Sequence, residues 1–326
     1  MRLDGSDPAA VERAAAALGA GELVAFPTET VYGLGARADD DAAVAQIFAR
    51  KGRPSDHPLI VHVAEPADAQ RFAGAPLPPL AQRLMDAFWP GPLTVIVARA
   101  PGVANAAAGG QPSIGLRCPS HPVAQALLRA AAARGVPGVA GPSANRFGRI
   151  SPTQAAHVEA EFGPDLLVLD GGACAVGIES SIVDCSRGRA VLLRPGVLTR
   201  ERIEAAAGEP LMPADSLAPR APGTLDSHYA PRARLRLMSS KMLHTALHML
   251  GDLPSGLAVY SRTARPVAAG LRFRPMPAQP RQVAFELFAT LRELDSEGVQ
   301  IIWVEEPPPG PEWDGVRDRL QRAATP

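Results

Sequence analysis

Cysteine is scarce in this chain. The 326 residues include three cysteines, Cys118, Cys174 and Cys185, and no two of them form a CxxC pair. An odd number without paired spacing argues against a disulfide framework and against a cysteine-based zinc site. We therefore expect buried, unreactive thiols in a protein of a reducing compartment.

Long apolar runs and an excess of charge of one sign are absent as well. No stretch of about 18 apolar residues could cross a membrane, and Asp4, Asp7 and Glu12 make the N-terminus unlike a signal peptide. Lysine plus arginine and aspartate plus glutamate number 33 each, so the formal net charge is zero. We expect a cytoplasmic protein with no membrane partner, in which any basic cleft for a nucleic acid would be local.

Proline and glycine are abundant instead, at 34 and 30 residues. The hydrophobic fraction of 46% is nevertheless too high for a disordered chain, and the length suffices for two cores. Five prolines fall between Gly208 and Pro231, where apolar periodicity is weak, as in a linker. We predict a first domain over residues 1–207, a linker or lid over 208–231 and a smaller domain over 232–326.

Helical and extended patterns interleave in both parts, which indicates two α/β domains, the first with a mixed sheet. In the first part we predict strands over Leu23–Phe26, Leu59–Val63, Leu93–Ala98, Ile114–Arg117, Gly138–Ala140, Leu166–Leu169, Ser181–Asp184 and Val191–Arg194. Helices are predicted there over Asp7–Leu18, Asp40–Arg50, Ala67–Phe72, Pro79–Phe88 and His121–Arg134. In the second part we predict strands over Leu235–Met238, Gly256–Tyr260 and Gln300–Val304, and helices over Lys241–Leu250, Gln282–Glu297 and Trp313–Ala323.

The stretch from Val24 to Val63 holds the strongest candidate site. Its first strand ends at Pro27 in a turn that is rich in hydroxyl groups, with Thr28, Glu29, Thr30 and Tyr32. Gly33 and Gly35 follow, and we expect them to let the backbone pass close to a ligand. The next helix ends in Lys51-Gly52-Arg53-Pro54, which would direct two cations toward one phosphate or carboxylate. Taken alone, such cations more often only complement the helix dipole.

Other strand ends carry residues of the same kind. Arg117 and Arg194 each end a strand, and Gly141-Pro142-Ser143-Ala144-Asn145 follows another. Singly, each is an ordinary solvated arginine or turn. Together, these strand ends carry cations and small polar groups without interleaved acids. They lie at the edge where open α/β sheets bind ligands, so they indicate an anionic substrate.

One motif is set aside. Gly33-Leu34-Gly35-Ala36-Arg37-Ala38 fits the GxGxxA pattern of dinucleotide-binding folds. There the first glycine follows the strand directly, whereas residues 27–32 intervene here. The sequence also lacks GxxxxGK[ST], so a nucleotide would be bound by residues from several strand ends.

The motifs together resemble the YrdC-like family. The resemblance rests on residues 26–35 (FPTETVYGLG), 51–54 (KGRP), 58–62 (PLIVH), 89–94 (WPGPLT), 142–145 (PSAN) and 193–196 (LRPG), in matching order and spacing from about residue 12 to 207. The tail resembles the long form of that family, in which a linker ending in a motif such as His228-Tyr229-Ala230-Pro231 joins a small Rossmann-like α/β domain.

The resemblance implies an L-threonylcarbamoyladenylate synthase, a nucleotidyltransferase that makes threonylcarbamoyl-AMP and pyrophosphate from L-threonine, bicarbonate or CO₂ and ATP. The product would pass to a downstream threonylcarbamoyl transferase acting on tRNA. Mg²⁺ is expected to enter with ATP, without a protein metal site or an organic cofactor. By the family pattern the threonine site would comprise Thr30, His62, Arg117, Gly141 and Ser181. The ATP contacts would be Arg53, His57, Ser113, Ser143, Asn145, Ser151, Arg194 and Tyr229, with Lys51 and Arg53 as the catalytic cations.

The residues suggest catalysis by positioning and charge neutralisation, because no Ser-His-Asp set or carboxylate pair is evident. Two other functions stay open at this point. One is a non-catalytic RNA-binding module, which the neutral charge and the lack of interleaved aromatic and basic residues disfavour. The other is a carbamoyl-transfer maturation protein, which would be expected to carry paired CxxC motifs.

Overall fold

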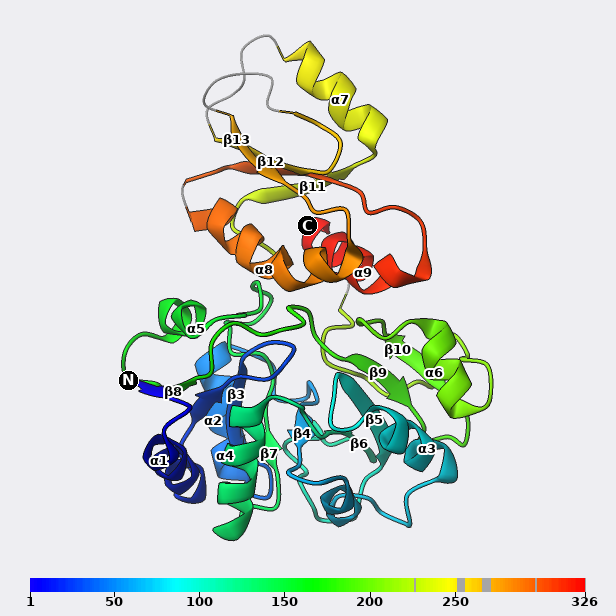
Figure 1. Ribbon diagram of the computed structural model, residues 1–326. Helices are drawn as coiled ribbons and strands as arrows, with labels where there is room; N and C mark the ends of the chain where they lie inside the picture. The colour runs from blue at the N-terminus through cyan, green and yellow to red at the C-terminus, as the bar shows by residue number, and fades with distance from the viewer. Residues whose placement is uncertain (226, 251–255, 266–270, 297, 326) are drawn as a thin grey trace.

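The computed structural model describes residues 1–225, 227–250, 256–265, 271–296 and 298–325. These residues form a larger domain around a ten-stranded sheet and a smaller domain around a four-stranded sheet. Figure 1 shows the smaller domain stacked on one end of the larger, with the linker passing between them.

The larger sheet is mixed, in the order β1-β8-β2-β3-β7-β4-β6-β5-β9-β10. Its strands are β1 (Arg2–Asp4), β2 (Val24–Phe26), β3 (Gly33–Arg37), β4 (Ile60–His62), β5 (Leu93–Ala98), β6 (Ser113–Arg117), β7 (Val139–Ala140), β8 (Leu167–Asp170), β9 (Ser181–Asp184) and β10 (Val191–Arg194). β4 and β6 are parallel neighbours, with His62 opposite Arg117. Their carboxyl ends therefore bring two predicted site residues side by side.

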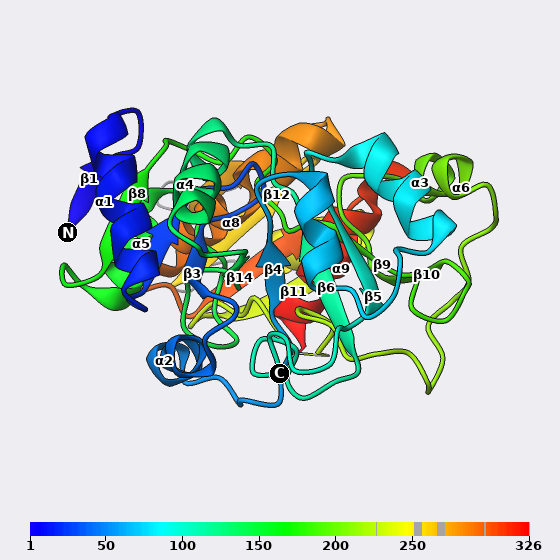
Figure 2. The ribbon, with the colours of Figure 1, turned by 90° about the horizontal axis from the view of Figure 1, so that it is seen from below.

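Helices cover both sides of this sheet. α1 (Pro8–Gly19) and α4 (Pro122–Ala133) contact each other and bury their apolar residues with those of β2, β7 and β8. α2 (Asp41–Lys51) packs on β3, and Figure 2 shows α4 and α2 on opposite sides of that strand. The remaining helices of this domain are η1 (Pro66–Arg71), α3 (Pro79–Phe88), α5 (Ala155–Phe162) and α6 (Arg200–Ala207).

The ends of α2 are set by local chemistry. The Asp40 carboxylate accepts hydrogen bonds from two backbone N–H groups of the first turn, as an N-cap should. The helix ends at Gly52, whose φ of 63° lies in the left-handed region that glycine adopts readily. The chain turns sharply there, so Lys51 remains on the helix while Arg53 leaves in a new direction.

The smaller sheet is parallel, in the order β11-β14-β12-β13. Its strands are β11 (Arg234–Met238), β12 (Leu257–Ser261), β13 (Arg272–Pro275) and β14 (Ile301–Glu305). Its helices are α7 (Ser240–Met249), α8 (Pro280–Ser296), η2 (Pro311–Trp313) and α9 (Asp314–Ala324). In Figure 1, α8 and α9 lie between this sheet and the larger domain, and α7 covers the far side.

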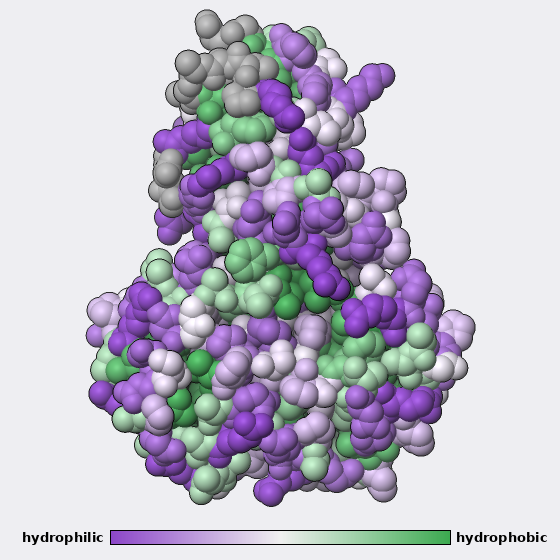
Figure 3. Space-filling view, viewed as in Figure 1, coloured by the Kyte–Doolittle hydropathy of each residue, from purple (hydrophilic) through white to green (hydrophobic). Residues whose placement is uncertain are grey.

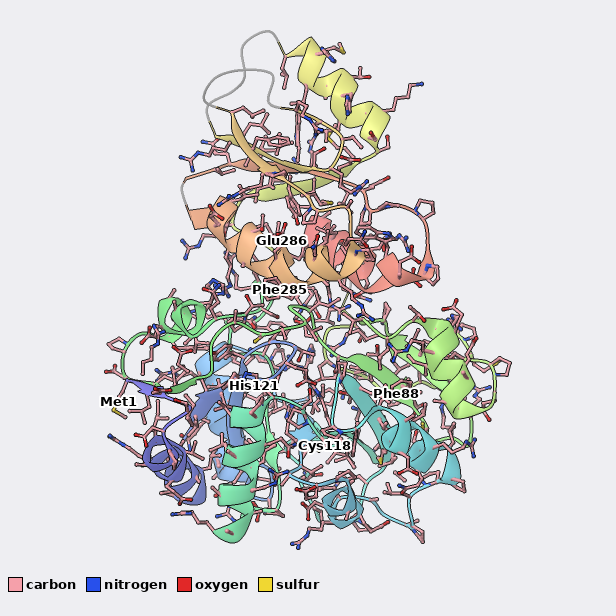
Figure 4. The ribbon with its side chains drawn as sticks, in the orientation of Figure 1. Met1, Phe88, Cys118, His121, Phe285 and Glu286 are labelled. Carbon is pink, nitrogen blue, oxygen red and sulfur yellow. The ribbon has the colours of Figure 1, made fainter. Side chains whose placement is uncertain are left out.

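Part of the domain junction is apolar and tightly packed. One cluster of buried residues joins Val31, Ile150 and Ile178 of the larger domain to side chains of α8 and α9. A Cβ atom at Gly315 of α9 would lie 2.4 Å from the carbonyl oxygen of Gly196, so only glycine fits this approach. Phe285 of α8, labelled in Figure 4, lies at the junction, and Figure 3 shows apolar surface in the same region. The two domains thus share part of a core.

The predicted α/β class and mixed first sheet are confirmed, but several elements were not predicted: β1, β3, α5, α6 and β13. The segment 67–72, predicted as a helix, is the 3-10 helix η1. The predicted helix end at Glu297 lies outside the described residues.

Gly35 was wrongly expected to make room for a ligand. It lies within β3, and a Cβ atom there would come within 2.8 Å of the Val139 side chain, so glycine serves sheet packing. The GxGxxA segment therefore forms strand β3 and does not begin a helix. This confirms the interpretation that it is not a dinucleotide-binding motif.

Among the helices that the structure describes, none combines the length and the apolar character that crossing a membrane requires.

Candidate functional site

A cavity of about 40 Å³ lies where the strand ends, the turn at residues 28–33 and the linker meet. Eight separate segments of the chain form its walls. The residues that line it are Thr28, Thr30, Val31, Gly33, Arg53, Ile60, His62, Arg117, Gly141, Pro142, Ser143, Glu179, Ser180, Arg194, Pro222, Gly223, His228 and Tyr229. The lining is rich in guanidinium and hydroxyl groups, which suits a polar, anionic ligand.

One end of the cavity is organised by Arg117. Its guanidinium donates to the Glu29 carboxylate at 2.6 Å, to the Thr30 hydroxyl at 2.9 Å and to the Gly91 carbonyl at 3.3 Å. The Thr30 hydroxyl lies 2.8 Å from that of Thr28, which also donates to a backbone carbonyl of the turn. A guanidinium carries five N–H donors, so these three bonds leave two for a ligand.

The other end carries two buried guanidinium groups without a carboxylate partner among the described residues. Arg53 donates to the Pro58 carbonyl at 3.0 Å, and its Nε has no hydrogen-bond partner. Arg194 donates to the backbone and hydroxyl oxygens of Ser180 and to the Pro222 carbonyl. Burial lowers the pKa of Arg53 to about 10. Keeping unpaired cations out of water is unfavourable, and an anionic ligand would offset the cost.

Lys51 does not line the cavity. Its ammonium donates to the carbonyls of Ser143, at 2.6 Å, and Asn145, and so braces the turn that presents Ser143 to the cavity. Burial, and then the neighbouring Arg53, lower the pKa of Lys51 well below its ordinary value. Asn145 donates to two backbone carbonyls, while its Oδ1 has no partner. Lys51-Gly52-Arg53 (the KxR motif) and Ser143-Ala144-Asn145 (the SxN turn) thus meet in space, with the lysine beneath the turn.

The structure brings together many of the residues predicted from the sequence. Those that line the cavity are Thr30, Arg53, His62, Arg117, Gly141, Ser143, Arg194 and Tyr229. Ser151 donates to Glu179 at 2.5 Å and lies behind the wall. Ser181 is buried beside the lining residue Ser180, and its hydroxyl has no partner.

Two predicted residues lie elsewhere. His57 faces an adjoining cavity that shares Arg53, Gly223 and His228 with the first, and its ring meets that of Phe147 edge-on. Ser113 begins β6, at the opposite end of the strand from Arg117, and does not line either cavity.

The sequence-based expectation of strand ends without acids is wrong. Glu29 and Glu179 are both buried at the cavity walls and form ion pairs with Arg117 and Arg319. Burial alone would raise the pKa of Glu179, but the nearby guanidinium groups and the Ser151 hydroxyl outweigh it and lower that pKa. Arg319 belongs to the second domain, where sequence reasoning found no functional residue.

The linker covers the cavity. Tyr229 is fully buried with a φ of 63°, stacks on Phe288 of α8 at 5.4 Å between ring centroids, and has a hydroxyl without a partner. His228 packs edge-on against it at 4.0 Å. With the linker in this position the cavity is much smaller than the roughly 300–1,000 Å³ that small-molecule sites need. Entry of a ligand of that size therefore requires the linker to move.

Two buried histidines should make stability depend on pH. Burial lowers the pKa of both His62 and His228 to about 3, from 6.5. Above pH 6.5 both imidazoles are neutral whether the chain is folded or unfolded. Below pH 6.5 they become protonated in the unfolded chain but stay neutral in the folded chain. We expect each to lower the unfolding free energy by about 1.4 kcal/mol per pH unit as the pH falls below 6.5.

Urea unfolding at pH 7, 6 and 5 measures this slope. His62→Gln and His228→Gln should each flatten it, whereas the exposed control His248→Gln should not. A slope in both buried-site variants equal to that of the unchanged chain would contradict the interpretation.

The fold and the cavity define a two-domain α/β protein with a linker-covered, cationic ligand site. Comparison with known proteins specifies it further. The Sua5_yciO_yrdC family model, described as telomere recombination, matches residues 16–196, and the model described as threonylcarbamoyl-AMP synthase, C-terminal domain, matches residues 198–325.

Relatives of known name agree over nearly the whole chain. A threonylcarbamoyl-AMP synthase of Bacillus subtilis is 37% identical, over 99% of this chain and 94% of the relative. One of Pyrococcus abyssi is 35% identical, over 93% of this chain and 91% of the relative. The crystal structure of Pyrococcus abyssi Sua5 complexed with L-threonine has a TM-score of 0.87 at 33% identity, covering 98% of this chain and 95% of that one.

The chain belongs to the threonylcarbamoyl-AMP synthase family in its two-domain form. The predicted YrdC-like membership, fold and enzyme class, a nucleotidyltransferase, are thereby confirmed. The two alternatives, a non-catalytic RNA-binding module and a carbamoyl-transfer maturation protein, are set aside.

Proposed function

We propose that the chain joins L-threonine, bicarbonate or CO₂ and ATP into threonylcarbamoyl-AMP with release of pyrophosphate. The observation that carries the proposal is the pair of buried, carboxylate-free guanidinium groups, Arg53 and Arg194, in one cavity with Arg117. Such a cavity accepts two anionic reactants. The threonine complex of the Pyrococcus abyssi relative supports the choice of amino acid.

Threonine would bind at the Arg117 end. Its carboxylate would take the two guanidinium N–H groups that Glu29, Thr30 and Gly91 leave over. Its hydroxyl and amine need small polar partners, which Thr30, Ser181 and the Gly141 backbone would supply. His62 stays neutral at physiological pH, since its pKa is about 3, and its Nδ1 has no partner, so it can accept a hydrogen bond from the ammonium.

ATP would bind between the Arg53 and Arg194 walls. Arg53, Arg194 and Ser143 would contact the phosphates, and Tyr229 of the linker would close over the nucleotide. We assign His57, Ser113, Asn145 and Ser151 to the same site from the family pattern; their positions make Asn145 and Ser151 supports of the wall. Lys51 would act through the Ser143–Asn145 turn that it holds.

In the reaction, the threonine amine would first add to CO₂ and lose a proton, or condense with bicarbonate and release water, to give the carbamate N-carboxythreonine. A carbamate oxygen would then attack the α-phosphorus while the bond to the leaving pyrophosphate breaks. Both reactants are anions, so the guanidinium groups lower the barrier by neutralising charge and fixing geometry. We propose no covalent step on the protein, because the carboxylate that lines the cavity, Glu179, is already engaged in hydrogen bonds with Arg319 and Ser151. A trapped covalent intermediate, seen by intact-protein mass spectrometry, would refute this.

Magnesium would enter with ATP. In the part of the chain that the structure describes, three or more histidine, cysteine or carboxylate side chains do not gather into a metal site.

The wider context follows from the product. A mixed anhydride of a carbamate and a phosphate is reactive, so an enzyme that transfers the threonylcarbamoyl group is the expected consumer. The family pattern makes it a transferase acting on tRNA, and we expect both proteins in the cytoplasm. We divide the chain for this function into a catalytic domain (1–207), a linker that acts as a lid (208–231) and a supporting domain (232–326).

Pyrophosphate release from ATP by the purified chain tests the proposal. Release should require both L-threonine and bicarbonate, and mass spectrometry should detect threonylcarbamoyl-AMP. Pyrophosphate release that is the same without threonine, or an absence of that product, would overturn it.

A further inference from the structure

Arg319, on α9 of the second domain, is buried at the wall of the cavity in the first domain. Its side chain is 0% exposed, and its Nε donates to the Glu179 carboxylate at 2.8 Å. It also donates to the backbone carbonyl of Glu179 at 3.2 Å and to that of Pro195 at 2.7 Å. Asp318 accepts a further bond at 2.7 Å. Arg319 is therefore shielded from water and held in place by hydrogen bonds to two loops of the other domain.

Both loops that Arg319 holds carry cavity residues. Glu179 itself lines the cavity and accepts from Ser151 on its other oxygen. Pro195 follows directly on Arg194, whose guanidinium in turn donates to the backbone and hydroxyl oxygens of Ser180, next to Glu179. Arg319, Glu179 and Arg194 thus form one connected set of bonds along one wall.

The same arginine contacts the lid. Its guanidinium lies over the ring of Tyr229, 5.5 Å from the centroid, while Phe288 stacks on that ring at 5.4 Å. One turn further along α9, Arg322 donates to the Leu225 carbonyl of the linker, and its own carbonyl accepts from the His228 N–H. A single helix therefore contacts both the wall and the lid of the cavity.

We infer that Arg319 is a positioning residue of the active site: it fixes Glu179 and the Arg194 loop in the arrangement that binds the nucleotide, and it couples this arrangement to the closed position of Tyr229. The inference rests on the proposed function, because it takes the cavity to be the ATP site. Its consequence is that the second domain completes the nucleotide half of the site. The Arg117 end of the threonine half is held separately, since Arg117 donates to Glu29, Thr30 and Gly91.

Kinetics of Arg319→Met test this inference. The substitution keeps the bulk of the side chain and removes every bond to the wall. We expect the KM for ATP to rise about tenfold or more and kcat to fall, with the KM for threonine within about twofold of the original. Arg319→Lys should restore part of the loss, because an ammonium can reach Glu179 but cannot also serve Pro195 in the same plane.

A second variant separates positioning from folding. Arg319→Met alone leaves the Glu179 carboxylate buried without its cation, which is unfavourable. The double variant Glu179→Gln/Arg319→Met removes both charges and keeps an acceptor for Ser151. It should melt near the original temperature and still have a raised KM for ATP.

The matched control is Arg262→Met. Arg262 also forms a partly buried ion pair, with Glu305 at 2.8 Å, but its hydrogen bonds go to Met276, Glu305 and Glu306, all within the second domain. It should change stability without changing the KM for ATP. An unchanged KM for ATP in Arg319→Met or in the double variant, with the unchanged chain active, would overturn the inference. Failure of the proposed function would look different, because the unchanged chain would then make no threonylcarbamoyl-AMP.

Discussion

Arg53→Ala is expected to lower kcat/KM by about 30- to 1,000-fold, on the order of 2 to 4 kcal/mol of transition-state stabilisation. Arg53 lines the cavity, is 9% exposed, and has no carboxylate partner in the described chain. Its charge is thus free for the phosphates. Removing an unpaired buried cation also relieves a desolvation cost, so the variant should be at least as stable as the original.

Steady-state pyrophosphate release and a thermal melt together measure this outcome. The control is Arg50→Ala, three residues earlier, where the guanidinium donates to the Phe162 carbonyl and lies over the Phe162 ring. It should retain normal turnover. Near-normal turnover in Arg53→Ala would show that the residue is no phosphate clamp.

Lys51→Ala should behave differently, although the sequence places both cations in one motif. The Lys51 ammonium donates to two backbone carbonyls. Its loss would leave the Asn145 carbonyl buried without a donor and the Ser143 carbonyl with the Asn145 N–H alone. We expect activity and stability to fall together, by on the order of 1 to 3 kcal/mol in unfolding free energy. A stable but inactive Lys51→Ala would instead favour a direct catalytic role.

Sequence reasoning located the cavity because its residues follow apolar strands. The pattern before Arg117 and Arg194 predicts strands, and residues at the ends of neighbouring strands meet in space whatever their distance along the chain. The His62–Arg117 pair, from parallel neighbours β4 and β6, is the clearest example. The SxN turn was found in the same way, since it follows β7.

What sequence reasoning missed depends on partners far apart in the chain. Arg319 lies in the segment Asp318-Arg319-Leu320-Gln321-Arg322, whose charges are typical of a solvated helix face. It is buried because it forms an ion pair at the domain junction with Glu179, which lies 140 positions earlier in the chain. β3 was missed for another reason: its two glycines carry no strand signal, and they are tolerated because neighbouring side chains fill the space.

Deleting residues 208–326 is expected to leave a folded first domain that has lost most of its activity. The first domain has its own large cores, from which the deletion removes only Leu211. It loses the Tyr229 cover, however, together with the Arg319 partner of Glu179 and the apolar contacts of Val31 and Ile178. We expect kcat/KM to fall by about 100-fold or more, because a reaction between two anions depends on exclusion of water and exact alignment.

A chain ending at residue 231 distinguishes the two causes, because it keeps the linker but lacks the helices that fix it. In the full chain Tyr229 stacks on Phe288 and lies under Arg319. Without α8 and α9 the linker keeps its bonds to the first domain at Pro222 and Ala230, but the Tyr229 ring loses both side chains that fix it over the cavity. We therefore expect the 1–231 chain to be nearly as inactive as 1–207, with circular dichroism confirming that both are folded. Undiminished activity of 1–207 would contradict the proposal that the linker acts as a lid. Full activity of 1–231 would show that the linker closes the site without the second domain.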